Sequence, residues 1–191
     1  RNSGAKHHIF KHNDIDDLEK KLRTCNIDNP KLIVCESIYS MEGIRSPLKE
    51  IVRLAKKYNS LTYLDEVHSV GLYGPSGSGI AAELGISNDI DIINGTLSKS
   101  FGQMGGYIAA NADLIDYIRS FAPGFIFTSS INPSVAAASI KSIEISKVAE
   151  TLRLKIKENS SIIRDGLRSI NVPFIDNESH IVPILVKGPL E

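Results

Sequence analysis

Short apolar runs that end abruptly in polar residues alternate along this chain with segments of helical periodicity. Residues 32–35 form such a run and lead into Glu36 and Ser37. Residues 61–64 form another and lead into Asp65. Continuous apolar runs of this length are typical of strands buried on both faces. Their alternation with helices predicts α/β architecture with a mostly parallel sheet, and functional residues are expected where the strands end.

The expected elements follow one another at short intervals. Helices are expected where a capping residue or proline precedes apolar positions at helical spacing. They cover residues 13–25, 46–58, 80–84, 112–121 and most of 133–168. The expected strands are residues 32–35, 61–64, 91–97, 106–110, 125–129, 172–175 and 181–186. This order predicts a large-domain region over residues 1–149, followed over residues 150–191 by a linking helix and the start of a small domain.

Composition argues against several classes of partner. The chain carries 22 basic and 22 acidic residues, so no net charge favours nucleic acid or an anionic membrane. There is no apolar stretch long enough to cross a bilayer, and the polar start does not resemble a signal peptide. These features predict a cytoplasmic protein with neither partner. The absence of an initial Met indicates a fragment of a longer protein.

Lys99 follows the expected strand 91–97 and lies among small residues, with Gly95 and Gly102 nearby. Glycines allow the backbone to pack closely around a ligand. A partly desolvated amine at this place can react with a carbonyl, which is what a Schiff-base lysine requires. A solvated loop lysine is the alternative, and Lys99 taken alone does not decide between the two.

Asp65 and His68 follow the expected strand 61–64. A carboxylate at a strand end can pair with a protonated pyridine nitrogen and keep the ring electron-withdrawing. A nearby histidine can hydrogen-bond a phenolic oxygen or transfer a proton. The alternatives are a helix cap or surface acid for Asp65 and a structural role for His68.

The Asp-Glu-Val-His sequence that begins at Asp65 also matches the nucleotide-hydrolysis box of helicases. A nucleotide-binding module that uses Asp65 and Glu66 is therefore a competing hypothesis. It requires a phosphate loop whose last glycine is followed by Lys and then Ser or Thr. In this chain Gly79 is followed by Ile80 and Ala81, so the match fails.

A metal site composed of Asp65, Glu66 and His68 is also disfavoured. Side chains at a strand end alternate in direction, and no further His or Cys cluster completes a coordination shell. Cys25 and Cys35 lack the spacing of zinc ligands. We therefore predict no metal.

Hydroxyl side chains follow three of the apolar runs. They are Ser37 and Ser40, Thr96 and Ser98, and Thr128, Ser129 and Ser130. Each group by itself is explained by turn formation. Together they supply neutral donors for a phosphate or a phenolate without a cluster of basic residues, a combination that fits pyridoxal phosphate.

In residues 36–43, 65–74, 95–102 and 125–130 the sequence resembles the α-oxoamine synthases. These are fold-type I pyridoxal-phosphate enzymes that condense an amino acid with an acyl-coenzyme A and release carbon dioxide. The resemblance covers nearly the whole chain. It implies the large domain of that fold, a mostly parallel sheet with helices on both faces, and the start of a C-terminal α+β domain. Glu42 departs from the pattern, because the family usually has Asp there.

The resemblance also implies roles for individual residues. Lys99 is the Schiff-base lysine and the acid–base group, and Asp65 is the partner of the pyridine nitrogen. His68 and Ser40 contact the phenolic oxygen, and Thr96 binds the phosphate. The catalytic set implied is therefore Lys99, His68 and Asp65.

Thr128 and Ser129 are implied to reach the phosphate in a second subunit, which predicts a homodimer with shared active sites. Members of the family are about twice the length of this chain. The ring-stacking histidine, the carboxylate-binding arginine and most coenzyme A contacts are expected outside it. This segment alone is therefore expected to be inactive.

Within the family, residues 11–14, 124–128 and 179–183 favour one branch. That branch condenses glycine with succinyl-coenzyme A to give 5-aminolevulinate, coenzyme A and carbon dioxide, the first step of tetrapyrrole and haem synthesis. Glycine C-acetyltransferase and 8-amino-7-oxononanoate synthase are the alternatives within the family. A catalytically inactive scaffold is a further alternative.

Overall fold

A four-stranded sheet forms the centre of the structure, a computed structural model that describes residues 4–186. The strands are β1 (Leu32–Glu36), β2 (Leu61–Asp65), β3 (Ile92–Thr96) and β4 (Gly106–Ala110). They are ordered β1-β2-β3-β4; the first three are parallel, and β4 is antiparallel to β3. This arrangement confirms the predicted α/β architecture with a mostly parallel sheet.

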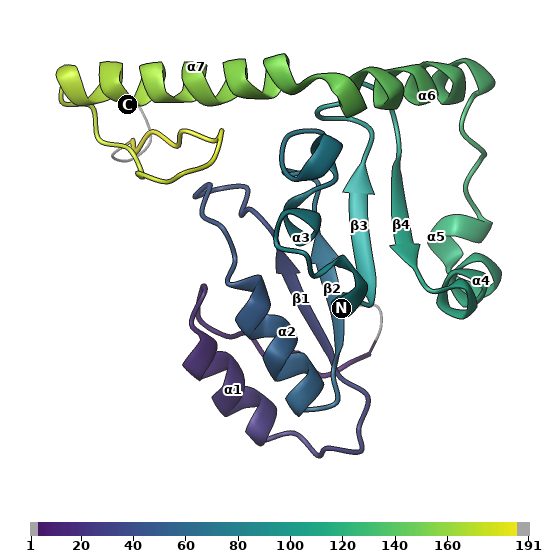
Figure 1. The fold of residues 1–191 in the computed structure, drawn as a ribbon. Coiled ribbons are helices and arrows are strands. Elements are labelled where there is room, and N and C mark those ends of the chain that lie inside the picture. The colour runs from purple at the N-terminus through teal and green to yellow at the C-terminus, as the bar shows by residue number, and fades with distance from the viewer. Residues whose placement is uncertain (1–3, 187–191) are drawn as a thin grey trace.

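The helices occupy the segments that the periodicity predicts, with one addition, α5. They are α1 (Ile15–Arg23), α2 (Leu48–Lys57), α3 (Ile80–Glu83), α4 (Ala112–Phe121), α5 (Pro123–Ile126), α6 (Pro133–Val148) and α7 (Glu150–Ser169), with short 3-10 turns at Pro75–Gly77 and Ser87–Asp89. The helices α6 and α7 follow one another in a line that runs above the carboxyl ends of β1, β2 and β3 (Figure 1). Among the described helices, none combines the length and the apolar character needed to cross a membrane.

One face of β1 and β2 packs against α1 and α2. Ile33 and Leu64 point into this core, where they join Leu18 and Leu54 among the buried side chains. Alternate residues of a strand face opposite sides, so the neighbouring side chains point away from α1 and α2. Val34 is one of these and is more than half exposed. Within residues 4–186, β1 is therefore covered on one face only, and the expected burial of both its faces is not seen.

The prediction of a strand over residues 125–129 is wrong. Pro123 begins α5, where its fixed φ and missing N–H suit the first position of a helical turn. The carbonyl of Ala122 accepts N–H groups from Phe125 at 2.9 Å and Ile126 at 3.0 Å. A short apolar run does not by itself distinguish a buried strand from a helical turn.

The two strands predicted near the end of the chain form only an isolated antiparallel bridge between Phe174 and Ile184. Pro173 and Pro183 stand beside this bridge. Their carbonyls accept hydrogen bonds, at 2.9 Å each, but a proline has no N–H to donate to a ladder. The pairing therefore stops after one bridge.

The division predicted between residues 149 and 150 coincides with the boundary between α6 and α7, which only Ala149 separates. Nothing else in the structure tests the assignment of two domains, which stays a prediction. Residues 187–191, the end of the predicted second region, lie outside the described residues.

Candidate active site

The carboxyl ends of β1, β2 and β3 lie side by side at one edge of the sheet (Figure 1). The register pairs Glu36 with Asp65 and Asp65 with Asn94. Thr96 ends β3, and Lys99 lies three residues beyond it. Because the strands are parallel, candidate residues from separate parts of the sequence converge at this edge.

Two hydrogen bonds hold the Asp65 carboxylate in one orientation. The backbone N–H of Val67 donates to Oδ1 at 2.9 Å, and Nδ2 of Asn94 donates to Oδ2 at 3.1 Å. The side chain is partly buried at the end of β2. Donors to both oxygens fix the direction in which the carboxylate points, and a carboxylate is the group that pairs with a cationic ring nitrogen.

Lys99 occupies a tight turn after β3. The N–H of Gly102 donates to the carbonyl of Lys99 at 3.1 Å, and the N–H of Gln103 donates to the carbonyl of Leu97 at 2.7 Å. The Lys99 side chain is exposed. Within residues 4–186, no group accepts a hydrogen bond from the Lys99 amine, and no carboxylate forms an ion pair with it. The amine is therefore available to a ligand.

His68 is partly buried and lies within range of the charge of Lys99. Burial lowers the pKa of His68, and the positive charge of Lys99 lowers it further, whereas Glu36 and Asp65 oppose the shift. The imidazole is therefore neutral at neutral pH. A neutral ring can donate through one nitrogen and accept through the other, as contact with a phenolic oxygen requires.

Thr96 and Ser98 form a hydroxyl pair at the end of β3. The two side-chain oxygens lie 2.7 Å apart, and the N–H of Ser98 donates to Oγ1 of Thr96 at 3.1 Å. Thr96 is buried, whereas Ser98 is exposed. At the end of β1, exposed Ser40 is held through its N–H, which donates to Oε2 of Glu36 at 3.0 Å. These hydroxyls share the strand-end edge with Asp65.

Thr128 and Ser129 lie apart from this group. Both are exposed, on the segment that leads from α5 to α6 beside the edge strand β4 (Figure 1). Within the described residues the structure therefore does not bring them to Asp65 and Lys99. Their predicted contact with the phosphate of a second subunit stays a prediction.

Glu66 points in another direction from Asp65 and is almost completely buried, at 1% exposure. Its Oε1 accepts the N–H of Ala81 at 2.8 Å, and its Oε2 accepts the N–H of Ile80 at 3.1 Å. Burial raises the pKa of Glu66, and the N–H of Ala81 is the strongest opposing influence. Glu66 is thus occupied by the start of α3 and does not join Asp65 in a nucleotide site. Nor do residues 4–186 contain a group of three His, Cys, Asp or Glu side chains that could hold a metal ion.

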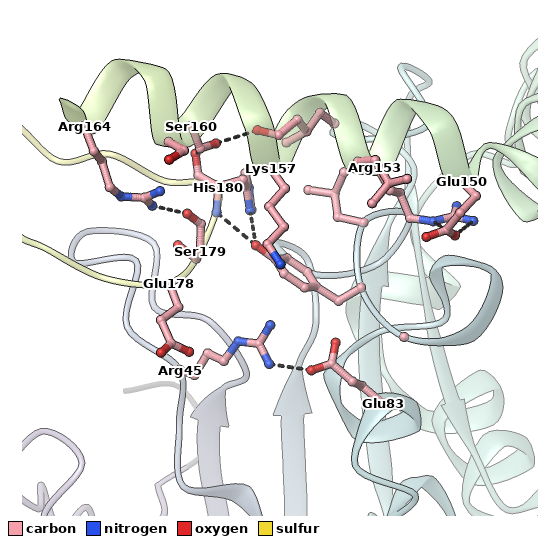
Figure 2. Close-up of a pocket in the computed structure, with 16 residues that line it drawn as sticks. Arg45, Glu83, Glu150, Arg153, Lys157, Ser160, Arg164, Glu178, Ser179 and His180 are labelled. Atoms are coloured by element: carbon pink, nitrogen blue, oxygen red, sulfur yellow. Dashed lines mark hydrogen bonds and ion pairs between the residues drawn. The ribbon is translucent and has the colours of Figure 1, made fainter. Parts of the chain in front are cut away.

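A cavity of about 760 Å³ lies between α7 and the loop after β2 (Figure 2). Tyr73 and His180 lie in its wall and are joined by two hydrogen bonds. The Tyr73 oxygen lies 3.0 Å from Nδ1 of His180 and accepts the backbone N–H of His180 at 2.9 Å. Buried Arg164 on α7 donates to the carbonyl of Ser179. Asp65 and Lys99 do not line this cavity, which is therefore distinct from the strand-end group.

Sequence reasoning did not assign Asn94 to the site. One signal was available, because Asn94 and Thr96 are two residues apart and so share a face of β3. Its contact with Asp65 nevertheless depends on the register between β2 and β3, which the sequence does not reveal. The link between Tyr73 and His180 was missed because the two residues are 107 positions apart.

The strand-end group fits pyridoxal phosphate. It offers an unoccupied amine in Lys99, an oriented carboxylate in Asp65 and a neutral imidazole in His68. The hydroxyls of Thr96 and Ser98 provide neutral donors on the neighbouring strand. The ring nitrogen of the cofactor requires an accepting carboxylate, its carbonyl a nucleophilic amine, and its phosphate donating hydroxyls.

Comparison with known proteins identifies the family of this chain. The family model described as aminotransferase class I and II matches residues 1–191. A serine palmitoyltransferase from Sphingomonas wittichii superposes with a TM-score of 0.89 at 33% identity, over 94% of this chain and 46% of that one. An 8-amino-7-oxononanoate synthase from Francisella tularensis, at 21% identity, shares the fold with a TM-score of 0.81, over 97% of this chain and 54% of that one.

The chain therefore belongs to the aminotransferase class I and II family, the fold-type I group of pyridoxal-phosphate enzymes. Its curated relatives include 5-aminolevulinate synthases. It is 51% identical to that enzyme from Paracoccus denitrificans, over 100% of this chain and 47% of the relative. It is 49% identical to that of Rickettsia typhi, over 99% of this chain and 46% of the relative. These matches confirm the resemblance to the α-oxoamine synthases, and the chain spans about half the length of these relatives.

Proposed function

We propose that the full-length protein carrying this chain is a pyridoxal-phosphate-dependent 5-aminolevulinate synthase, which condenses glycine with succinyl-coenzyme A and releases coenzyme A and carbon dioxide. The main observation behind this proposal is that about half of the residues, along the whole chain, are identical to those of enzymes with that name. The strand-end group of Asp65, His68 and Lys99 supports the proposal, because its geometry suits the cofactor.

In this proposal Asp65 and Lys99 carry the central chemistry. When bound, the cofactor supplies an electron-withdrawing ring that makes the α-proton and the carboxylate of the amino acid easier to remove. Asp65 keeps the ring nitrogen protonated, and Asn94 and the N–H of Val67 hold its carboxylate in place. Lys99 would hold the cofactor through Nζ, and the same atom would accept the α-proton of the amino acid and return it.

The other residues orient the cofactor. His68 and Ser40 contact the phenolic oxygen, and lowering of the pKa of His68 keeps its imidazole neutral for this contact. Thr96 binds the phosphate on the same chain, with Ser98 as its hydrogen-bonded neighbour.

The working unit in this proposal is a homodimer whose sites are shared between subunits. Thr128 and Ser129 supply phosphate contacts to the partner's site, which agrees with their exposure on a segment beside β4. A chain limited to residues 1–191 is then inactive, because the remaining substrate contacts lie outside it. The cytoplasmic location stays a prediction, since the relatives include bacterial enzymes and one named mitochondrial, from Schizosaccharomyces pombe.

Steady-state assays test the proposal directly. The purified full-length protein is given pyridoxal phosphate and glycine with succinyl-, acetyl- or pimeloyl-coenzyme A, and product is measured for each. We expect the largest kcat/KM with succinyl-coenzyme A and formation of 5-aminolevulinate. A larger kcat/KM with acetyl- or pimeloyl-coenzyme A would reassign the protein to another α-oxoamine synthase. Activity with none of the three would refute the proposal.

A further inference from the structure

Glu66 receives hydrogen bonds from three groups in the interior of the protein. The N–H groups of Ala81 and Ile80 donate to its two carboxylate oxygens at 2.8 Å and 3.1 Å, and the Ser69 hydroxyl donates to Oε2. A backbone N–H can only donate, so these donors suit a carboxylate, whose oxygens accept. The carbonyl of Asn94 accepts the backbone N–H of Glu66 at 2.8 Å, which ties the residue to β3 as well.

The turn that Glu66 anchors reaches the other strand ends. At β1, Ser37 donates from its Oγ to that of Ser69 at 3.1 Å, and both residues are fully buried. Towards β3, the backbone at Gly71 lies so close to Ser100 that a Cβ at Gly71 would stand 2.4 Å from the Cβ of Ser100. Gly71 also has φ +85°, a conformation that glycine adopts without strain. Through this turn Glu66 is linked to the residue beside Lys99.

We propose that Glu66 is a positioning residue for the cofactor site. It fixes the turn after β2, so that Asp65 and His68 face the cofactor and Lys99 keeps a fixed position relative to them. The inference rests on the proposed function, because it assigns Glu66 a task at that same site. Asp65 precedes Glu66 directly, and His68 lies two residues beyond it. A shift of the buried carboxylate therefore moves both. A displacement of about 1 Å at a reacting group can lower a rate about 100-fold.

A glutamate that only stabilised the fold would behave differently. Its loss would lower the free energy of unfolding, while the folded fraction would bind the cofactor normally. A positioning residue changes the cofactor's surroundings in the folded protein, which is visible in the colour and the affinity of the bound cofactor. The two roles are therefore separated by measurements on folded protein.

Glu66→Gln in the full-length protein tests the inference. The side-chain NH₂ places a donor against the N–H of Ile80 or Ala81, with almost no change in size. Glu83→Gln is the matched control, because Glu83 lies in α3, the helix that donates to Glu66, but is partly exposed and paired with Arg45 at 2.5 Å. We measure the dissociation constant of pyridoxal phosphate, the pH titration of its visible absorbance, and kcat and KM for glycine. Urea unfolding of the cofactor-free protein measures stability separately.

For Glu66→Gln we expect the cofactor's dissociation constant to rise about tenfold and kcat to fall about 10- to 100-fold, with little change in KM for glycine. The pH titration of the visible band should also shift, and Glu83→Gln should match wild type throughout. A folded Glu66→Gln protein with wild-type affinity and titration would overturn the inference.

If Glu66→Gln does not fold, Ser69→Ala takes its place. It removes one donor to the carboxylate and the link to Ser37 while leaving both N–H donors of α3 in position. A smaller shift in the same direction is expected, and wild-type cofactor binding would overturn the inference. The cofactor measurements require no acyl-coenzyme A. A wild-type protein that binds the cofactor but makes no 5-aminolevulinate would therefore refute the proposed function alone.

Discussion

Acidification should destabilise the protein through His180, because this imidazole is held neutral in the folded state. Burial, followed by the charges of His68, Arg164 and Lys99, lowers the pKa of His180 from 6.5 to about 4. Between these values the unfolded chain binds a proton that the folded protein does not. The contribution of neutral His180 to stability is therefore fully present above pH about 6.5 and is lost as the pH falls towards about 4.

The expected magnitude follows from the size of this pKa change. For a fully buried group it would correspond to about 3 kcal/mol, at 1.36 kcal/mol per pH unit. His180 is only partly buried, and solvent reduces the effect. We therefore expect His180 to account for about 1 kcal/mol of the stability lost between pH 7 and pH 5.

Urea unfolding at pH 7 and pH 5 measures this loss in the cofactor-free, full-length protein. The variant is His180→Gln, whose amide can still bond to Tyr73 but does not titrate. The control is His8→Gln, because His8 is exposed. The free energy of unfolding should fall about 1 kcal/mol less in His180→Gln than in wild type, and equally in His8→Gln and wild type. Equal pH dependence in wild type and His180→Gln would refute the reasoning.

Three further predictions concern the proposed active site in the full-length protein. Borohydride treatment of the yellow holoprotein should fix the cofactor to the peptide that contains Lys99; attachment at another lysine would contradict the assignment. Asp65→Asn should stay folded by circular dichroism but lose at least about 100-fold in kcat, because a neutral partner no longer holds the ring nitrogen protonated. Near-normal turnover would remove Asp65 from the mechanism. The third prediction uses a heterodimer, isolated with two affinity tags, in which one chain carries Lys99→Ala and the other carries Thr128→Ala and Ser129→Ala. It should recover up to about half of wild-type activity, because one of its two sites is intact. Activity no higher than the mean of the two mutant homodimers would rule out the shared site.

The sequence was sufficient to predict that Asp65 and Lys99 follow parallel strands and lie at the same edge of the sheet. Each follows an apolar run, and a run that alternates with helices indicates a parallel strand whose carboxyl end meets those of its neighbours. This rule needs no knowledge of which strands are adjacent. It failed at residues 125–129, because the helix-forming effect of Pro123 competes with an equally short apolar signal.

The sequence by itself thus determined that the sheet is mostly parallel and which kinds of side chain follow its strands, since both depend on patterns within a few residues. Only the tertiary structure decided which partner holds each of those side chains. Asn94 meets Asp65 across 29 positions, and the N–H of Ala81 meets Glu66 across 15. Such contacts depend on strand register and on the path by which a loop returns. Neither leaves a local pattern in the sequence, because hydrogen-bond geometry is set by distances in space.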